Sequence, residues 1–362
     1  MTAIPMAGKD PRRNVHDPEE LNTGAPPVLL QDPLTPTSLW FTRSHAPVPI
    51  VDAASYRLTV TGLVERPLTL TLTELEAIGR QESLATLVCA GLRRVELEAY
   101  RPVPGELLWG SEPISTARFS GLPLRRVLER AGVKAGASHV EFIGLDRVER
   151  HGEIFGFGGS IPLAKALSDE VILADRMNGA PLAPEHGFPL RAVVPGYYGA
   201  RSVKWLGQVV VRDAPSVNYF QAQAYRVQRA VDPEHPRSVA QGSPLGEVVL
   251  NSAILEPEAG ARVKAGTVRL TGWAIAAGGG APARVEVSAD GQAWRAATLT
   301  GEGSFAWRHW SLDVMLAAGA HTLAVRAIDH DGAVQPAELA EVWNVKGYAN
   351  NAWHRVQVTA AD

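Results

Sequence analysis

The chain has 362 residues, of which 46% are hydrophobic, and its 35 basic and 38 acidic side chains leave a formal net charge of −3. This balance gives no reason to expect nucleic acid or a membrane surface as a partner, and no apolar run reaches the ~18 residues of a spanning helix. The length exceeds that of a usual single core, so we expect about two globular domains.

The N-terminal segment, residues 1–37, is rich in proline and polar residues. Pairs such as Asp-Pro and Thr-Pro favour an extended path over the surface of a domain. The segment has no apolar signal core, and Arg12-Arg13 is followed by polar residues, so it is a poor export signal. We therefore expect a cytoplasmic protein, or a periplasmic one if a leader has been removed.

An aromatic cluster at residues 39–41 is followed by Arg43, His45 and a proline stop. This stretch is compatible with a capped loop beside the core. It is also compatible with an anion site, because the guanidinium fork of arginine suits oxyanions.

The next elements lead to the only cysteine of the chain. Alternating residues predict a strand at 56–60, and a threonine at 71 or 73 is expected to cap a helix over 70–78. An apolar strand end then precedes Cys89, which cannot form an internal disulfide and is either a buried packing residue or a reactive thiol. Arg93 and Arg94 follow closely, and nearby positive charge is expected to lower the thiol pKa.

The middle of the chain combines basic residues with glycines. After a predicted helix at 125–132 and a strand at 139–145, the glycine-rich residues 156–162 are expected to form a turn whose N–H groups approach an anion. Residues 177–207 then interleave histidine, arginine and lysine with apolar strands. Such cations are not buried without anionic partners or hydrogen bonds, and a buried phosphate is a natural partner.

The C-terminal part of the sequence has a different residue pattern. Asp-Pro, His-Pro and Ser-Pro pairs indicate a linker around residues 231–245. Asp-Gly pairs at 290–291 and 331–332 predict hairpins. Short alternating strands are typical of a β-sandwich, and we expect them at residues 268–275, 283–288, 294–299, 305–314 and 321–329.

Four motifs in this order resemble the sulfite oxidase family. They are FTRSHAPVP at 41–49, CAGLRR at 89–94, MNGAPLAPEHGFPLRAVVPGYYGARSVKWLG at 177–207 and WNVKGYANNAWHRV at 343–356. The chain departs from the family at Ser44 and Leu92, where asparagine is common, and at Lys346, where sulfite oxidases have arginine.

The resemblance implies an α+β molybdopterin-binding domain followed by an all-β immunoglobulin-like sandwich. The expected organisation is an extended segment at 1–37, the catalytic domain at 38–230, a linker at 231–245 and a dimerisation domain at 246–362. The implied single protein ligand to molybdenum is Cys89. The implied cofactor contacts are Phe41, Thr42, Arg43, Ser44, His45, Cys89, Asp146, His186, Arg191, Arg201, Ser202, Val203 and Lys204.

The residues implied to act on the substrate are Tyr225, Arg43, Lys346, Arg94 and Trp109. Trp109 is equally compatible with core filling, and Arg94 with a structural ion pair. Lysine at 346 keeps the charge of the family's arginine but loses its bidentate fork.

The implied reaction is the oxidation of sulfite to sulfate by a homodimeric enzyme that contains a molybdenum–molybdopterin cofactor. The sequence has no recognisable heme or flavin segment, so electrons are expected to pass to an external acceptor such as a cytochrome c or oxygen. A related molybdenum enzyme that reduces a sulfoxide, nitrate or another oxyanion is the alternative, although Tyr225 and the charge of Lys346 favour sulfite. A non-enzymatic binding module is a third possibility, against which the converging buried cations argue.

Overall fold

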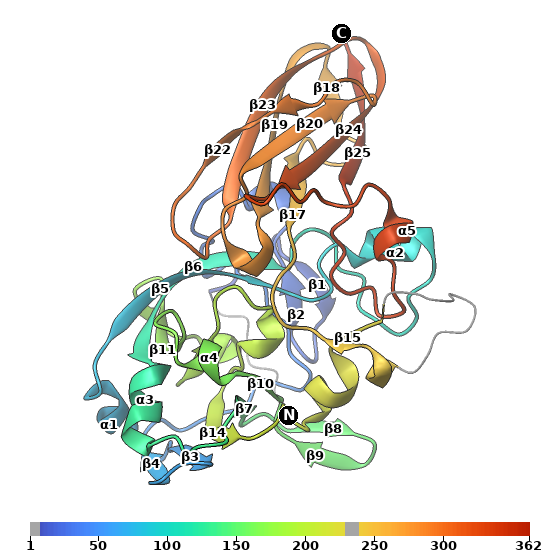
Figure 1. Ribbon diagram of the computed structural model, residues 1–362. Helices are drawn as coiled ribbons and strands as arrows, with labels where there is room; N and C mark the ends of the chain where they lie inside the picture. The colour runs from blue at the N-terminus through green and yellow to red at the C-terminus, as the bar shows by residue number, and fades with distance from the viewer. Residues whose placement is uncertain (1–7, 229–238) are drawn as a thin grey trace.

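The computed structural model describes residues 8–228 and 239–362. An α+β domain comes first and an elongated β-sandwich stands on it (Figure 1). This arrangement confirms the fold class expected from the sequence. No helix in the described ranges is both long and apolar enough to cross a membrane.

The first domain is built on two mixed or antiparallel sheets. One has the order β10-β7-β14-β3-β4, and the other has the order β12-β11-β6-β5 with β13 paired to β11. A large apolar core packs against the first sheet and includes Phe142 and Leu206. The strands of these two sheets are β3 Leu58–Gly62, β4 Leu68–Leu70, β5 Gln81–Val88, β6 Ile114–Pro123, β7 His139–Gly144, β10 Gly158–Pro162, β11 Ile172–Met177, β12 Ala180–Pro181, β13 Arg191–Val193 and β14 Leu206–Arg212.

Small strand pairs and short helices complete this domain. The pairs are β1 Asn14–Asp17 with β2 Asn22–Gly24, β8 Val148–Arg150 with β9 Glu153–Phe155, and β15 Arg226–Val227 with β16 Ser243–Pro244. The α-helices are α1 Leu72–Glu76, α2 Arg94–Tyr100, α3 Leu124–Ala131, α4 Leu163–Ala166 and, near the C-terminus, α5 Leu339–Val342. Single 3₁₀ turns are η1 Pro27–Leu29, η2 Pro184–His186, η3 Gly199–Arg201 and η5 Val239–Gln241, and η4 Phe220–Ala224 is a π turn. A further 3₁₀ turn, η6 Ala277–Gly279, belongs to the second domain.

The helix predicted at 70–78 is shorter than expected, and Thr71 is its cap. The Thr71 hydroxyl accepts a hydrogen bond from the backbone N–H of Glu74, whose carboxylate accepts one from the N–H of Thr71 in return. This reciprocal capping box satisfies two N–H groups that the helix leaves unpaired and fixes where it begins.

The prediction of a glycine-rich turn at 156–162 is wrong for most of these residues. Residues from Gly158 onwards form β10, which pairs with β7. A side chain at Gly158 would collide with the amide of Asn218, and one at Gly159 with the guanidinium of Arg201. These glycines therefore allow two polar side chains to approach the strand, and they are not there to make a turn.

The second domain is a sandwich of two sheets around a separate apolar core that includes Trp310 and Val325. The sheet orders are β17-β19-β23-β22 and β18-β25-β24-β20-β21. The strands are β17 Asn251–Glu256, β18 Arg262–Lys264, β19 Gly266–Ile275, β20 Arg284–Ala289, β21 Arg295–Ala296, β22 Thr298–Thr300, β23 Arg308–Leu316, β24 Gly319–Ile328 and β25 His354–Ala361.

Most predicted strands of this domain are present, with two corrections. The stretch 294–299 is not one strand, because β21 pairs with β20 in one sheet and β22 pairs with β23 in the other. The Asp-Gly pair at 290–291 joins β20 to β21 as a hairpin, but the one at 331–332 does not join two strands. After it the chain turns inward, because the buried Gln335 amide bonds Ser252 and the backbone of Ala327 and Asn351.

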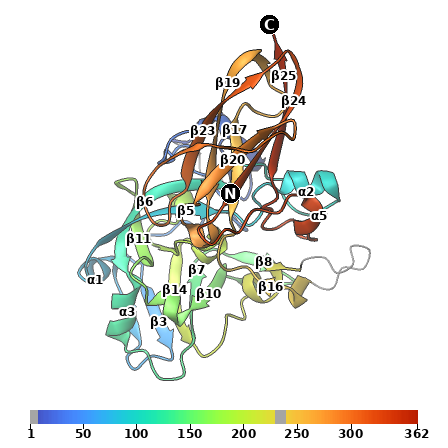
Figure 2. The same cartoon turned by 45° about the horizontal axis from the view of Figure 1, so that its top comes forward.

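The segment between β24 and β25 leaves the sandwich and packs on the first domain, with α5 beside α2 (Figure 2). The indole of Trp343 donates to the carbonyl of Arg101, and the N–H of Ala349 donates to the carbonyl of Ala90. The C-terminal motif is therefore held next to the cysteine loop. The predicted linker at 231–245 lies mostly outside the described residues, and its last part is docked, since β16 pairs with β15.

Candidate active site

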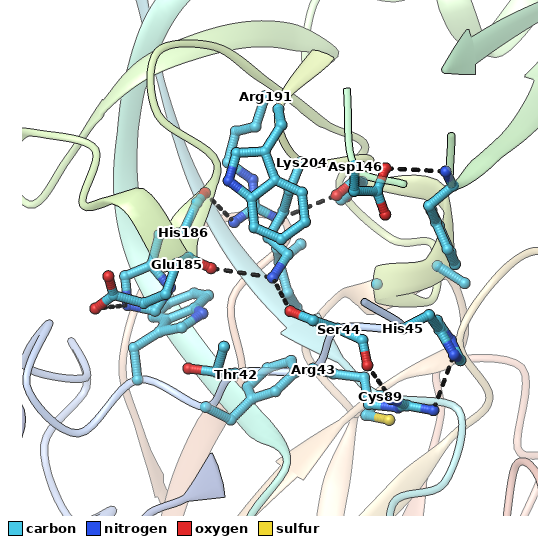
Figure 3. Close-up of a pocket in the computed structure, with 18 of the residues that line it drawn as sticks. Thr42, Arg43, Ser44, His45, Cys89, Asp146, Glu185, His186, Arg191 and Lys204 are labelled. Carbon is cyan, nitrogen blue, oxygen red and sulfur yellow. Dashed lines mark hydrogen bonds and ion pairs between the residues drawn. The ribbon is translucent and has the colours of Figure 1, made fainter. Parts of the chain in front are cut away.

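A pocket opens where β5 ends, with an empty volume of about 720 Å³ that includes its mouth. The loop 40–45 forms one wall, and residues from η2 to Trp205 form another (Figure 3). Twelve of the residues predicted to touch cofactor or substrate line it: Phe41, Thr42, Arg43, Ser44, His45, Cys89, Asp146, His186, Arg191, Ser202, Lys204 and Tyr225. The tertiary structure thus brings together residues from five separated stretches of the chain.

Cys89 follows directly after β5 and is only 8% exposed. Burial raises the pKa of its thiol, and this outweighs the opposing effect of the Arg43 and Arg94 guanidinium groups. Arg94 thus acts in the expected direction but is outweighed by burial, and Arg93 is not among the groups that shift the thiol pKa. Arg93 points elsewhere, since it pairs with Glu96 at 2.6 Å. A metal ion bound to the sulfur would favour the thiolate far more strongly.

The loop that carries Arg43 is shaped by the N-terminal segment. Thr42 and Thr23 exchange backbone hydrogen bonds, and the side-chain oxygen of Asn22 accepts from the N–H of Ser44 at 2.8 Å. One nitrogen of the Arg43 guanidinium donates to Asn22 at 3.2 Å and to Glu20 at 3.4 Å. These contacts fix the position of a half-buried cation in the pocket that contains Cys89.

Two basic side chains, Arg191 and Lys204, are desolvated in the opposite wall. Arg191 donates to the carbonyls of His186 and Ser202, and Lys204 donates to the Ser44 hydroxyl at 2.8 Å and to the carbonyl of Glu185. Burial lowers the pKa of Arg191 to about 10, and burial together with Arg191 holds the pKa of Lys204 well below its usual value. The carboxylates of Asp146 and Glu185 offset part of the Lys204 charge. Among the described residues, however, Arg191 has only neutral acceptors, so this wall suits an anionic group.

His45 and Tyr225 are hydrogen-bonded at the edge of the pocket. The distance from His45 Nε2 to Tyr225 Oη is 2.8 Å, and Nη2 of Arg43 lies 3.2 Å from His45 Nδ1. Because a guanidinium only donates, Nδ1 accepts, and the neutral ring donates through Nε2 to the tyrosine oxygen. Burial holds the pKa of His45 well below its usual value, and it raises that of Tyr225 to about 12. The hydroxyl proton of Tyr225 is therefore free to donate into the pocket.

Five predicted site residues do not line this pocket. Val203 belongs to the apolar core, and Arg201 is buried with one guanidinium nitrogen bonded to the carbonyl of Leu245. Trp109 is fully buried with its ring against His16. The remaining two, Arg94 and Lys346, both pair with a carboxylate, that of Glu106.

Sequence reasoning missed several pocket residues. Trp40, Glu185 and Trp205 line the pocket, and each is a chain neighbour of a predicted residue, so the motif strings already contained a signal. Lys9 contacts His186 from 177 residues away. No local sequence pattern predicts a contact between residues so far apart in the chain.

The donor set fits a metal that brings most of its own ligands. In the described part of the chain, no group of three or more His, Cys, Asp or Glu side chains is placed to hold a metal ion. A single buried cysteine beside a cationic wall suits a metal complex that carries soft sulfur ligands and an anionic group. A molybdenum–molybdopterin cofactor has both features.

Comparisons with known proteins agree with this site. The family described as "Oxidoreductase molybdopterin binding domain" matches residues 45–220, and that described as "Mo-co oxidoreductase dimerisation domain" matches residues 244–361. The chain is 34% identical over 380 residues to the sulfite oxidase of Arabidopsis thaliana, which covers 96% of this chain and 94% of that protein. This chain belongs to the sulfite oxidase family.

Two further proteins are similar to this chain. The mitochondrial sulfite oxidase of Homo sapiens is 41% identical over 365 residues, which is 97% of this chain but only 66% of the human protein. The structure of the sulfane dehydrogenase SoxCD from Paracoccus pantotrophus superimposes with a TM-score of 0.82 at 27% identity, covering 96% of this chain and 88% of that one. Most of the residues that line the pocket lie within 45–220, the range that matches the molybdopterin-binding family.

Proposed function

We propose that the protein oxidises sulfite to sulfate at a molybdenum–molybdopterin centre held in this pocket. The observation that carries the proposal is one buried cysteine that shares a pocket with Arg43, Tyr225 and a wall of desolvated cations. Sulfite gains one oxygen atom from water and releases two protons and two electrons. The cofactor supplies the oxygen-atom transfer and stores the electrons.

The residues of this chain are proposed to bind the metal and the anionic part of the cofactor. Cys89 binds the metal through its thiolate, Arg191 and Lys204 neutralise the anionic part of the cofactor, and His186 contacts it as a neutral ring. These cations are held by backbone carbonyls and by the Ser44 hydroxyl. The site is therefore preorganised for negative charge before any ligand enters.

Arg43 and Tyr225 are proposed to act on the substrate. The Arg43 guanidinium attracts the sulfite dianion towards Cys89. The Tyr225 hydroxyl, which accepts a hydrogen bond from His45, donates its own proton to a substrate oxygen. Since burial raises the pKa of Tyr225 to about 12, the phenol stays protonated and can donate throughout the ordinary working range.

Several expectations from the sequence remain part of the proposal. Lys346 and Arg94 are expected to contribute charge at the substrate entrance. The pocket-wall role implied for Trp109 is not part of the proposal, because this fully buried ring does not line the pocket. The match of residues 244–361 to a dimerisation family supports a homodimer. The electron acceptor is proposed to be an external carrier such as a cytochrome c, with oxygen as the alternative, and the cytoplasm is the proposed compartment.

An anaerobic visible spectrum tests the function directly. Protein from a host that makes the cofactor is measured before and after sulfite is added. A thiolate-to-molybdenum charge-transfer band that bleaches with sulfite is the expected result. A band that does not change when sulfite is added would support the molybdenum site but favour a reductase of another oxo compound. The absence of a band would indicate that Cys89 is a buried packing residue.

A further inference from the structure

The N-terminal segment reaches the pocket wall through Lys9. The Lys9 side chain is 3% exposed, and its Nζ lies 3.1 Å from the carboxylate of Glu185. The same ammonium contacts Nε2 of His186 and donates to the carbonyl of Thr37 at 2.9 Å. Glu185 and His186 both line the pocket (Figure 3).

The contact with Lys9 fixes the state of the His186 ring. An ammonium group only donates, so Nε2 of His186 must accept and the ring proton must sit on Nδ1. His186 is 1% exposed and cannot exchange partners with solvent. Lys9 therefore determines the tautomer of a pocket residue and holds the carboxylate next to it.

Arg13 adds a second cation from the same segment. It is 6% exposed and donates through Nη2 to the Thr42 hydroxyl at 3.2 Å and to the Trp40 carbonyl at 3.3 Å. Its Nε and Nη1 have no hydrogen-bond partner within the described ranges. Buried guanidinium donors without an acceptor are costly, and a nearby anion would remove that cost.

The residue before Arg13 behaves differently. The Arg12 side chain is 63% exposed and pairs only with Asp10, within the same turn. One arginine thus faces solvent while its neighbour is buried beside pocket residues. The contrast argues that the segment is fitted to the pocket and does not merely carry scattered positive charge.

We propose that residues 8–24 form a clasp that is part of the cofactor site, in which Lys9 positions Glu185 and His186 and Arg13 adds positive charge for the anionic part of the cofactor. The clasp also carries Asn22, which orders the loop of Arg43. The proposal rests on molybdopterin binding by the family, and it does not depend on sulfite as the substrate.

The test measures cofactor retention in full-length protein from a host that makes the cofactor. Lys9→Met and Arg13→Met are compared with Arg12→Met, the matched control, and with Lys9→Arg as the conservative variant. Pterin and molybdenum released into a desalting buffer are followed over time. We expect Lys9→Met to release the cofactor about tenfold faster, the lower end of the effect of groups that orient metal ligands. Arg12→Met should match the wild type, and Lys9→Arg should recover most of the retention.

Trypsin cleavage of the wild-type chain gives a second readout that needs no variant. The bonds after Lys9 and Arg13 should be cut more slowly in loaded protein than in protein from a host that cannot make the cofactor. Equal cleavage in the two forms, or equal release by Lys9→Met and Arg12→Met, overturns the clasp. Because neither readout uses sulfite, a failure of the sulfite assay alone leaves this proposal intact.

Discussion

The ammonium Nζ of Lys346 lies 2.5 Å from Oε1 of Glu106, so the cation expected to hold the substrate anion is already paired with a carboxylate. The other oxygen of Glu106 lies 3.5 Å from the guanidinium of Arg94. Arg94 is further held by the carbonyls of Lys346 and Leu107. One carboxylate thus competes with any anionic substrate for two cations.

Replacing Glu106 with glutamine should therefore improve substrate binding. We expect Glu106→Gln to lower the KM for sulfite about threefold to tenfold, which corresponds to roughly 1 kcal/mol for one partly exposed ion pair. The kcat should change little, because Glu106 is not in the pocket. Steady-state kinetics at several salt concentrations checks this, with the exposed Glu82→Gln as control. An unchanged KM would mean that the substrate does not compete with Glu106.

Lys346 itself should set the affinity for the anion. We expect Lys346→Arg to lower the KM for sulfite, because a guanidinium can bind two oxygens at once, and Lys346→Met to raise it. The same kinetic assay measures both. If neither variant alters the constant, Lys346 serves only as the partner of Glu106.

Cys89→Ser should retain the fold and lose sulfite oxidation. The side chain is buried and serine is close in size, so thermal unfolding should shift little, whereas a hydroxyl does not replace a soft thiolate ligand. Circular dichroism and turnover, measured on one preparation, check the two halves of this prediction. A variant that keeps most of its turnover would contradict the assignment of Cys89 as the ligand.

Tyr225→Phe should lower kcat without loss of molybdenum. Because the pKa of Tyr225 is raised to about 12, the wild type and the variant should have the same shape of pH–rate profile below about pH 10. Metal analysis and the two profiles test this. Loss of molybdenum would instead give Tyr225 a structural role. A fall or rise of the pH–rate profile that occurs only in the wild type would mean that the phenol ionises during turnover.

Stability should depend on pH through His354, which joins the two domains. Its Nδ1 accepts from the N–H of Ile254 at 3.0 Å, its Nε2 lies 3.8 Å from Glu96, and burial lowers its pKa to about 4 from the usual 6.5. The unfolded chain therefore takes up a proton at this site between pH 6.5 and 4 while the folded chain does not. The contribution is present above pH 6.5 and is lost as pH falls to 4, by roughly 3 kcal/mol.

Urea unfolding at several pH values measures this slope. His354→Gln should flatten it, because glutamine keeps an acceptor for Ile254 but does not titrate. His330→Gln, at an exposed position, should leave the slope unchanged. An equal slope in the wild type and His354→Gln would assign the acid sensitivity to other groups.

The family, the fold class and most of the pocket residues were predictable from the amino-acid sequence. These follow from local patterns: Cys89 and Arg43 lie in short motif strings, and alternating strands specify the sandwich. The pairing of charged groups was not predictable and became visible in the three-dimensional structure. Burial reversed the expected pKa of the Cys89 thiol, Glu106 pairs with Lys346 across 240 residues, and Lys9 meets His186 across 177. Desolvation and long-range pairing depend on what packs around a group, and a linear motif does not contain that information.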